Sequence, residues 1–542
     1  MNHRSVLKGN LSKFFSGAPS PLAFAALAIA MAMALPLFYL VLRTVSMGTS
    51  SFGIFFNPRT LQIFLNSIFL AVVVTALSAI IAVPLAFMTV RTDLPWKRFW
   101  SVVTVLPLAI PSYVGSFAII SALGPRGSLL QKWLEPFGID SLPSIYGWPG
   151  AVLGLTLFTY PYILLTVRGS LYNIDPALEE AARTLGYNPF KTFFKVTLPH
   201  LYPSIAAGGL LVALYSLSDF GTPALMRFNT FTRAIYIQYQ SSFDRNMAAV
   251  LAIMLAALAI FILFMENKTR SNGIKYYTTR SGSIRPPFTI ALGKWRWPAI
   301  FLFSAVVMVA LVMPIGVISY WLLRGVLAGE PLVSVWHLAF NSVSVSIMAT
   351  FAAIFLALPV AFIAVRFPGI FSTLVERSTY TGFALPGIVV ALSLVFFGAK
   401  YATPLYQSFI MLVFAYVVLF IPQEVGTIRS SLLQVNPSLE EAARSMGSGL
   451  LKTLRHVTVP MMRSGVLTGA ALVFISTMKE LPATLLLAPT GFKTLATSIF
   501  SATDDAFFAR AAAPALLLVA ISAASMIIII SQEQQQQIKG HT

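Results

Sequence analysis

Two copies of one twelve-residue segment place paired carboxylates at a fixed spacing in this chain. The first copy runs from Asp175 to Gly186 and the second from Asn436 to Gly447, a shift of 261 residues. In each copy a capping residue and a proline precede two adjacent glutamates, which puts the glutamates at the positive end of a helix dipole. A glycine at the end of each copy is typical of helix termination. Each copy is therefore predicted to form a short helix with the chemistry of a binding surface.

The apolar residues of each predicted helix fall on one narrow face. In the first copy they are Leu178, Ala181, Ala182 and Leu185, at i, i+3, i+4 and i+7. Small alanines between larger residues favour docking into a groove of a partner, and the alternative is a helix that lies on the membrane or packs on its own bundle. Two copies with one pattern favour docking. The second copy has Leu439, Ala442, Ala443 and Met446.

Other residue types that carry enzyme chemistry are scattered or missing from the sequence. The chain has no cysteine, no two histidines at i, i+4, and no Gly-x4-Gly-Lys-Ser/Thr phosphate-binding loop. We therefore expect a chain that is not an enzyme and that binds no cofactor of its own. The histidines are His3, His200, His337, His456 and His541.

The elements that position the two segments are predicted to be membrane spans. Hydrophobic residues make up 57% of the 542 residues and charged residues only 10%, against about 25% charged in soluble domains. A bilayer-spanning helix needs about 20 apolar residues, so the pattern predicts an all-α polytopic membrane protein with a dozen spans. The apolar stretches are 22–46, 61–90, 99–123, 148–168, 204–219, 246–266, 297–323, 338–365, 378–398, 406–428, 465–480 and 513–531.

The formal net charge of +19 is interpreted as a signal of topology. In a soluble protein such a charge would suggest nucleic acid. Here most of the 37 Lys and Arg residues fall in segments that become cytoplasmic if the N-terminus lies inside. The sequence therefore predicts cytoplasmic N- and C-termini and no nucleic-acid partner.

The two groups of six spans resemble each other beyond hydrophobicity, which indicates an internal duplication. The predicted domains are a cytoplasmic leader (1–21), a first transmembrane domain (22–266), a solvated cytoplasmic linker (267–296), a second transmembrane domain (297–531) and a polar tail (532–542). Matches at a shift of 275 are Asn66-Ser67 with Asn341-Ser342, Pro84 with Pro359, and Arg91 with Arg366, and Leu106-Pro107 is matched with Leu385-Pro386.

At these residues the sequence resembles the permease subunits of ATP-binding-cassette (ABC) importers that work with a binding protein. Their signature is Glu-Ala-Ala, three residues, Gly, nine residues, an aliphatic residue, one more residue and Leu-Pro. The first copy fits it from Glu180 to Pro199, and the second from Glu441 to Pro460 with Val459 in place of Leu.

The resemblance implies that the two helices couple the bundle to two copies of an ABC ATP-binding subunit, which would hold ATP and Mg. It also implies a multi-pass protein of the cell inner membrane, served by a periplasmic binding protein. The residues to which it assigns coupling are Glu179, Glu180, Ala181, Ala182, Gly186, Glu440, Glu441, Ala442, Ala443 and Gly447.

The fused double layout resembles the ferric-iron importers, and so does the stretch Lys479-Glu480-Leu481-Pro482-Ala483-Thr484. Ferric iron delivered by a periplasmic ferric-binding protein is the expected substrate, and thiamine or another small solute is the alternative. Asp219, Lys479 and Glu480 are candidates for the entrance or pathway, unless they only pair locally, as Glu480 with Lys479. Iron(III) prefers oxygen ligands, but tyrosines such as Tyr160, Tyr162 and Tyr215 are more typical of an interfacial belt, and no metal site is assigned.

Two other classes of protein are weighed. A secondary transporter would need intramembrane carboxylates for a proton relay, and the span centres are nearly free of them. A membrane enzyme would need a cluster of His, Asp or Glu at one depth, which the sequence does not show.

Overall fold

A computed structural model describes residues 20–46, 48, 50–240, 245–272, 289–330 and 334–539. Throughout these residues the chain forms helices and no strand, and a single isolated β-bridge joins Thr92 to Ile290. The expected all-α fold is therefore confirmed. Most of the predicted leader, residues 273–288 of the linker and the last three residues of the tail lie outside the described residues.

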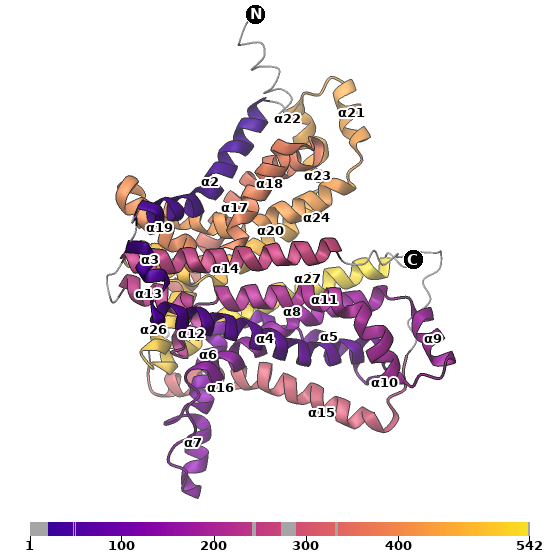
Figure 1. Cartoon of the computed structure of the whole chain (residues 1–542), viewed down its shortest axis with the longest axis vertical. Helices are drawn as coiled ribbons and strands as arrows, with labels where there is room; N and C mark the ends of the chain where they lie inside the picture. Colours follow the sequence, from indigo (N-terminus) through magenta and orange to yellow (C-terminus); the bar gives the residue numbers. More distant parts are fainter. Residues whose placement is uncertain are drawn as a thin grey trace, which may run out of the picture. The chain divides into compact units, whose positions relative to one another are not determined.

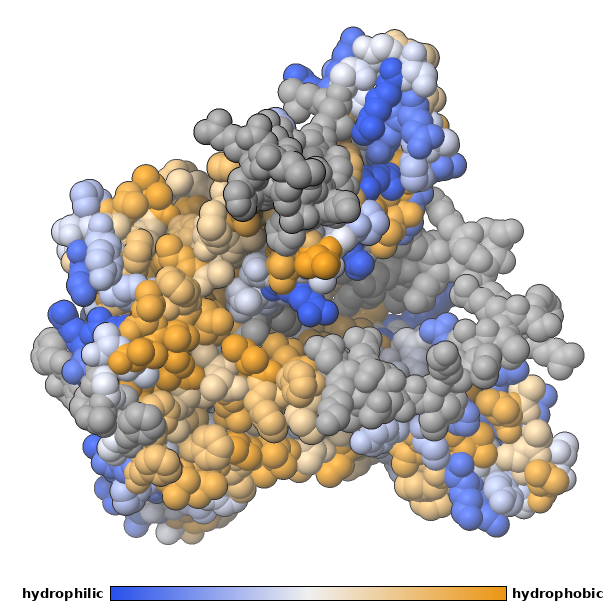
Figure 2. Space-filling view, turned by 45° about the horizontal axis from the view of Figure 1, so that its top comes forward, coloured by the Kyte–Doolittle hydropathy of each residue, from blue (hydrophilic) through white to orange (hydrophobic). Residues whose placement is uncertain are grey.

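Within the described residues, nine helical stretches are long and apolar enough to cross a membrane, and twelve spans result if each of three bent pairs is one span. Each predicted stretch corresponds to one of the twelve. Large apolar side chains such as Phe24, Phe301 and Phe355 are exposed on the spans, as expected for contact with lipid. Figure 2 shows apolar residues over much of the visible surface. The unbroken spans are α2 (Ser20–Ser46), α4 (Pro58–Arg91), α8 (Trp148–Asn173), α10–η3–α11 (Pro189–Thr192, Phe193–Thr197, Leu198–Ser218), α14 (Arg245–Asn272), η4–α15–η5–α16 (Gly293–Trp295, Arg296–Val307, Met308–Val312, Met313–Leu327), α17 (Ser334–Arg366), α20 (Phe409–Gln434) and α27 (Phe508–Lys539).

The third span of each half is broken at a proline. In the first half α5 (Lys97–Val103) and η1 (Leu106–Ala109) meet α6 (Ser112–Leu123) with a bend of 94°. In the second half α18 (Ile370–Ala384) meets α19 (Gly387–Tyr401) with a bend of 98°. Pro111 and Pro386 directly precede the second helix of each pair, where a residue without an N–H group interrupts the helix. The partner of Pro386 is therefore Pro111, at the common shift of 275, and the match of Leu106-Pro107 with Leu385-Pro386 was wrong.

The described chain divides into two compact units that do not follow the two halves of the sequence. Of the described residues, the first unit holds 20–46, 48, 50–54, 245–256 and 334–498, so α2 packs on α17, α18 and α19 of the second half. In this unit the Ser393 hydroxyl of α19 donates a hydrogen bond to the carbonyl of Pro36 in α2 (2.6 Å).

Of the described residues, the second unit holds 55–240, 257–272, 289–330 and 499–539, so α16, the last part of the seventh span, packs on α6 and α27. The Trp321 indole donates to Ser121 in this unit, and its ring packs against Phe508. Each unit thus combines the core spans of one half with the first span of the other (Figure 1).

The centre of each unit is a group of three spans in close contact. They are α4, α8 and α11 in one unit and α17, α20 and α24 (Arg463–Lys479) in the other. Gly208 of α11 approaches the backbone of Ile163 so closely that a Cβ would lie 2.8 Å from its Cα atom. Gly469 of α24 approaches Glu424 in the same way, with a Cβ 2.5 Å from Oε2. The two glycines therefore allow close packing of the spans.

The repeated Asn-Ser pair holds a loop in each unit. In the first half, Asn66 Nδ2 donates to the carbonyl of Asn229 (3.0 Å), and Ser67 Oγ accepts from the N–H group of Phe231 (3.0 Å), the first residue of α13 (Phe231–Gln240). Both side chains therefore come from α4 to fix the start of another helix. The second half repeats the bonds with Asn341, Lys493, Ser342 and Leu495, the last of which begins α26 (Leu495–Asp504).

Candidate functional site

The two predicted docking helices are present as α9 (Pro176–Thr184) and α21 (Pro437–Ser445). The side chain of Asp175 caps α9 by accepting a hydrogen bond from the N–H group of Ala177 (2.9 Å), and Asn436 caps α21 by accepting from Ser438 (3.1 Å). The sequence forms these helices where expected because cap, proline and first-turn glutamate stand in register.

Each docking helix ends at a glycine in the left-handed conformation. Gly186 has φ +86° and Gly447 has φ +85°. The N–H group of Gly186 donates to Arg183, and that of Tyr187 donates to Ala182 (3.1 Å), which is the Schellman pattern. No atom lies within 4 Å of a Cβ built at either glycine. The glycines are thus required by the backbone conformation and not by space.

The first glutamate of each pair is buried and anchors its helix to the bundle. Glu179 Oε1 accepts from the Thr197 hydroxyl (2.9 Å), and Oε2 lies 3.4 Å from Arg91 Nε. Arg91, at the end of α4, also donates to the carbonyl of Ile174, directly before the cap of α9 (3.2 Å). The guanidinium and the hydroxyl therefore fix the first turn of α9 from two spans.

The second half repeats this anchor with tighter geometry. Arg366 Nη2 lies 2.9 Å from Glu440 Oε1, and Nε lies 3.2 Å from each carboxylate oxygen. The Thr458 hydroxyl donates to Glu440 (3.2 Å), and Arg366 donates to Val435 (3.0 Å). Sequence reasoning recorded the two arginines only as part of the repeat, and it did not consider the threonines. Both pairs recur in the repeat, the arginines at a shift of 275 and the threonines at a shift of 261, and this recurrence could have identified the anchor.

The second glutamate of each pair is exposed, and so is only part of the predicted apolar face. In α9 the side chains of Glu180 and Ala181 are exposed, and Leu185 is 79% exposed, whereas Ala182 is 6% exposed. The same division holds in α21, where Ala443 is buried and Glu441, Ala442 and Met446 are exposed. The prediction that both alanines share one docking face was therefore wrong, because Ala182 and Ala443 pack on their own chain.

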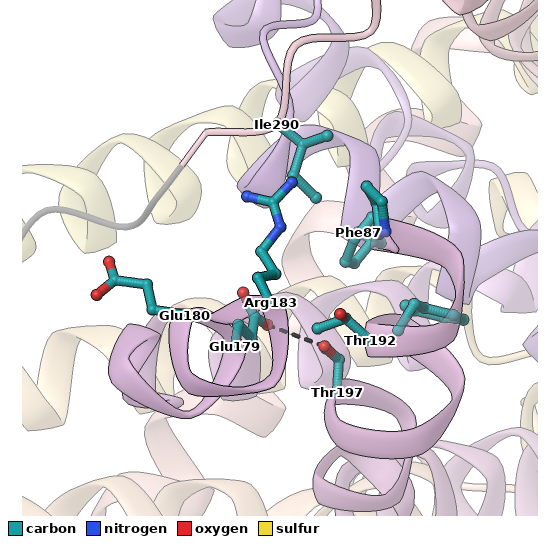
Figure 3. Close-up of a pocket in the computed structure, with 9 residues that line it drawn as sticks. Phe87, Glu179, Glu180, Arg183, Thr192, Thr197 and Ile290 are labelled. Atoms are coloured by element: carbon teal, nitrogen blue, oxygen red, sulfur yellow. Dashed lines mark hydrogen bonds between the residues drawn. The ribbon is translucent and has the colours of Figure 1, made fainter. Parts of the chain in front are cut away.

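A small cavity lies beside α9 (Figure 3). Glu179 turns toward Thr197, to which the figure draws the hydrogen bond, while Glu180 points away from it. One wall comes from Ile290, at the end of the linker, so the linker takes part in this site. The lining residues are Phe87, Glu179, Glu180, Arg183, Pro189, Thr192, Phe193, Thr197 and Ile290.

The candidate pathway carboxylates are local helix caps. Asp219 accepts from the Ser112 hydroxyl and from the N–H group of Thr222 (2.9 Å) in α12 (Gly221–Leu225). Glu480 accepts from the N–H group of Ala483 (3.1 Å) in α25 (Pro482–Leu487). Each carboxylate also lies against the residue that begins the second half of a broken span, Ser112 for Asp219 and Gly387 for Glu480.

The candidate tyrosines pack within the bundle. The Tyr160 side chain is buried, and its hydroxyl donates to the backbone carbonyl of Thr104 (2.7 Å). The rings of Tyr162 and Tyr215 lie 5.9 Å apart. Among the described residues, no three His, Asp or Glu side chains gather as a metal site would require. Lys479 ends α24.

An all-helical, duplicated membrane protein with an anchored docking helix in each half matches one family by sequence. The model described as "Binding-protein-dependent transport system inner membrane component" matches residues 80–269 and again 349–534. The chain belongs to this family of ABC importer permeases, as a fused double permease. Membership in this family excludes the alternative of a secondary transporter.

Two curated relatives named for iron transport cover most of the chain, and a third relative covers 37% of it. The chain is 34% identical to the Fe(3+)-transport system permease protein FbpB 2 of Haemophilus influenzae, over 88% of this chain and 91% of that protein. It is 25% identical to the ferric transport system permease protein FbpB of Actinobacillus pleuropneumoniae, over 88% of this chain and 74% of that protein. The molybdenum transport system permease protein ModB of Escherichia coli is 31% identical over 37% of this chain and 91% of its own length.

Proposed function

We propose that this permease carries ferric iron across the cell inner membrane, delivered by a periplasmic binding protein. The observation that carries the substrate is the 34% identity, over nearly the full length, to a relative named for Fe(3+) transport. Thiamine or another small solute is the alternative. A relative named for molybdenum transport shows that a similar permease can serve a different solute.

Two copies of an ABC ATP-binding subunit supply the energy in this proposal. They hold ATP and Mg, and they dock on the exposed faces of α9 and α21, with Glu180, Ala181, Glu441 and Ala442 at the contact. Glu179, Ala182, Glu440 and Ala443 act from behind this face by holding each helix in place. Closure of the ATP-binding subunits opens the bundle to the outside, and hydrolysis returns it to the cytoplasmic side.

In this proposal the N- and C-termini and both docking helices lie in the cytoplasm. The repeated anchors support one side for both helices, because Arg91 and Arg366 end equivalent spans. The chain contains no cysteine, so single cysteines can report accessibility cleanly. An impermeant thiol reagent added outside intact spheroplasts should label Lys132→Cys and spare Ala181→Cys, and the reverse pattern would contradict the orientation.

Reconstitution tests the substrate. The permease, its ATP-binding subunit and its binding protein in proteoliposomes should accumulate ferric iron when ATP is present on the docking-helix side. Thiamine, molybdate and sulfate serve as competing solutes. If one of these solutes accumulates and iron does not, that solute is the substrate in place of ferric iron. The assignment as an ABC importer would still hold.

A further inference from the structure

The end of the linker is paired with the chain directly beside the first docking helix. The N–H group of Ile290 donates to the carbonyl of Arg91 (2.8 Å), and that of Asp93 donates to the carbonyl of Ile290 (3.2 Å). The N–H group of Leu292 donates to Asp93 Oδ1 (2.8 Å). We call residues 290–292 the strap. This end of the linker is thus an ordered part of the site and not the solvated loop that the sequence suggested.

The strap reaches the docking helix by two routes. Its backbone binds Arg91, whose guanidinium holds Glu179 in the first turn of α9. The side chain of Ile290 lines the cavity together with Glu180 and Arg183 of α9 (Figure 3). A shift of the strap would therefore disturb both the anchor and the exposed edge of the docking helix.

The second half has an aromatic residue at the position that pairs with the strap in the first half. The residue equivalent to Thr92 is Phe367, and its ring lies 6.1 Å from that of Phe362, the equivalent of Phe87. Within the described part of the chain, no backbone hydrogen bond connects residues 366–368 with a distant segment. Within the described residues the strap therefore contacts the first docking site alone, and residues 15–17, at the equivalent position of the repeat, lie outside them.

The strap leads directly into the first span of the second half. Asp93 pairs with Arg296 (3.5 Å), the first residue of α15, which belongs to the same compact unit as α9. Hydrogen bonds and ion pairs thus connect α9 through Arg91 and the strap to α15 without a break. Among the residues described, the first unit carries no such connection from α21.

We propose that the strap is a working part of the first docking site, which positions α9 for the ATP-binding subunit and links α9 to α15. The strap acts on the first site through Arg91 and α9, so loss of its hydrogen bonds affects docking there and not at the second site. This inference rests on the docking role proposed above for α9 and α21.

The test compares the two sites within one complex. Ala181→Cys reports the first site and Ala442→Cys the second, each as the only cysteine in the full chain. Protection of each cysteine from a maleimide is measured with and without the ATP-binding subunit, and the concentration of subunit that gives half protection is determined. Ile290→Pro removes the N–H donor to Arg91, and Thr289→Pro, just outside the strap, is the matched control.

Ile290→Pro should raise the half-protection concentration at Ala181→Cys roughly fivefold, as expected for one lost hydrogen bond, and leave Ala442→Cys unchanged. Thr289→Pro should change neither. Equal loss at both sites, or no loss at the first, overturns the proposal. If Ile290→Pro cannot be purified, Ile290→Ala keeps the backbone bonds, opens the cavity and should give a smaller loss confined to the first site. Failure of both cysteines to be protected in the otherwise unchanged chain would instead overturn the docking role itself.

Discussion

Arg91 and Glu179 form a buried ion pair that joins the end of a membrane span to the first turn of a docking helix. Arg366 and Glu440 repeat it in the other half. The adjacent Glu180 and Glu441 are exposed. Two glutamates that stand side by side in the sequence thus have different surroundings, since one is bound within the chain and the other is exposed.

This difference in burial predicts that substitution of Glu179 lowers stability, whereas substitution of Glu180 does not. Glu179→Gln leaves the buried Arg91 without its countercharge, so the folded state should lose about 3–5 kcal/mol, and the melting temperature in detergent should fall. Glu180→Gln removes an exposed charge and should leave that temperature unchanged while weakening copurification of the ATP-binding subunit. Equal melting temperatures for the two variants would contradict this prediction.

The left-handed conformation of Gly186 predicts a loss of stability when a side chain is added there, although space is available. Gly186→Ala puts a Cβ into open surroundings but in a left-handed conformation, which costs about 1–2 kcal/mol. Gly169→Ala is the matched control, because its Cβ also meets open space, but on a helical backbone where alanine is favoured by up to about 1 kcal/mol. Thermal unfolding of the two variants should move in opposite directions.

A bulky residue at both Gly186 and Gly447 should separate ATP hydrolysis from transport. The ends of α9 and α21 would be distorted, so the reconstituted complex should retain ATPase activity and lose iron uptake. Uptake is measured in proteoliposomes beside the ATPase rate of the same preparation. Full iron uptake by this double variant would refute the coupling role of the two helices.

The sequence predicted the elements well because local patterns determine them. Asp175 and Gly186 mark the limits of α9 through short-range hydrogen bonds, and runs of apolar residues mark the spans. The burial of Ala182, the pairing of Arg91 with Glu179 and the seat of Ile290 depend on contacts between distant segments. A periodic pattern shows that two alanines share a face, but it does not show which of them packs on the chain itself.

We expect that α20 can be stabilised by replacing Glu424 with isoleucine, the residue at the equivalent position of the first half. Its carboxylate is fully buried in α20, and within the described part of the chain neither oxygen has a hydrogen-bond partner. The equivalent residue in α8 is Ile163, which packs against Gly208 as Glu424 packs against Gly469. A buried polar group without a partner costs about 1–3 kcal/mol in proteins, so Glu424→Ile should raise the melting temperature.

The reciprocal change tests whether the packing of this contact is responsible. Ile163→Glu should lower the melting temperature, because it places a second carboxylate against Gly208, in the same close contact between spans. Glu424→Gln keeps the shape and a polar group, so it should gain less than Glu424→Ile. A lower melting temperature for Glu424→Ile would show that the carboxylate has a stabilising partner, and uptake by that variant in proteoliposomes would then show whether transport needs the carboxylate as well.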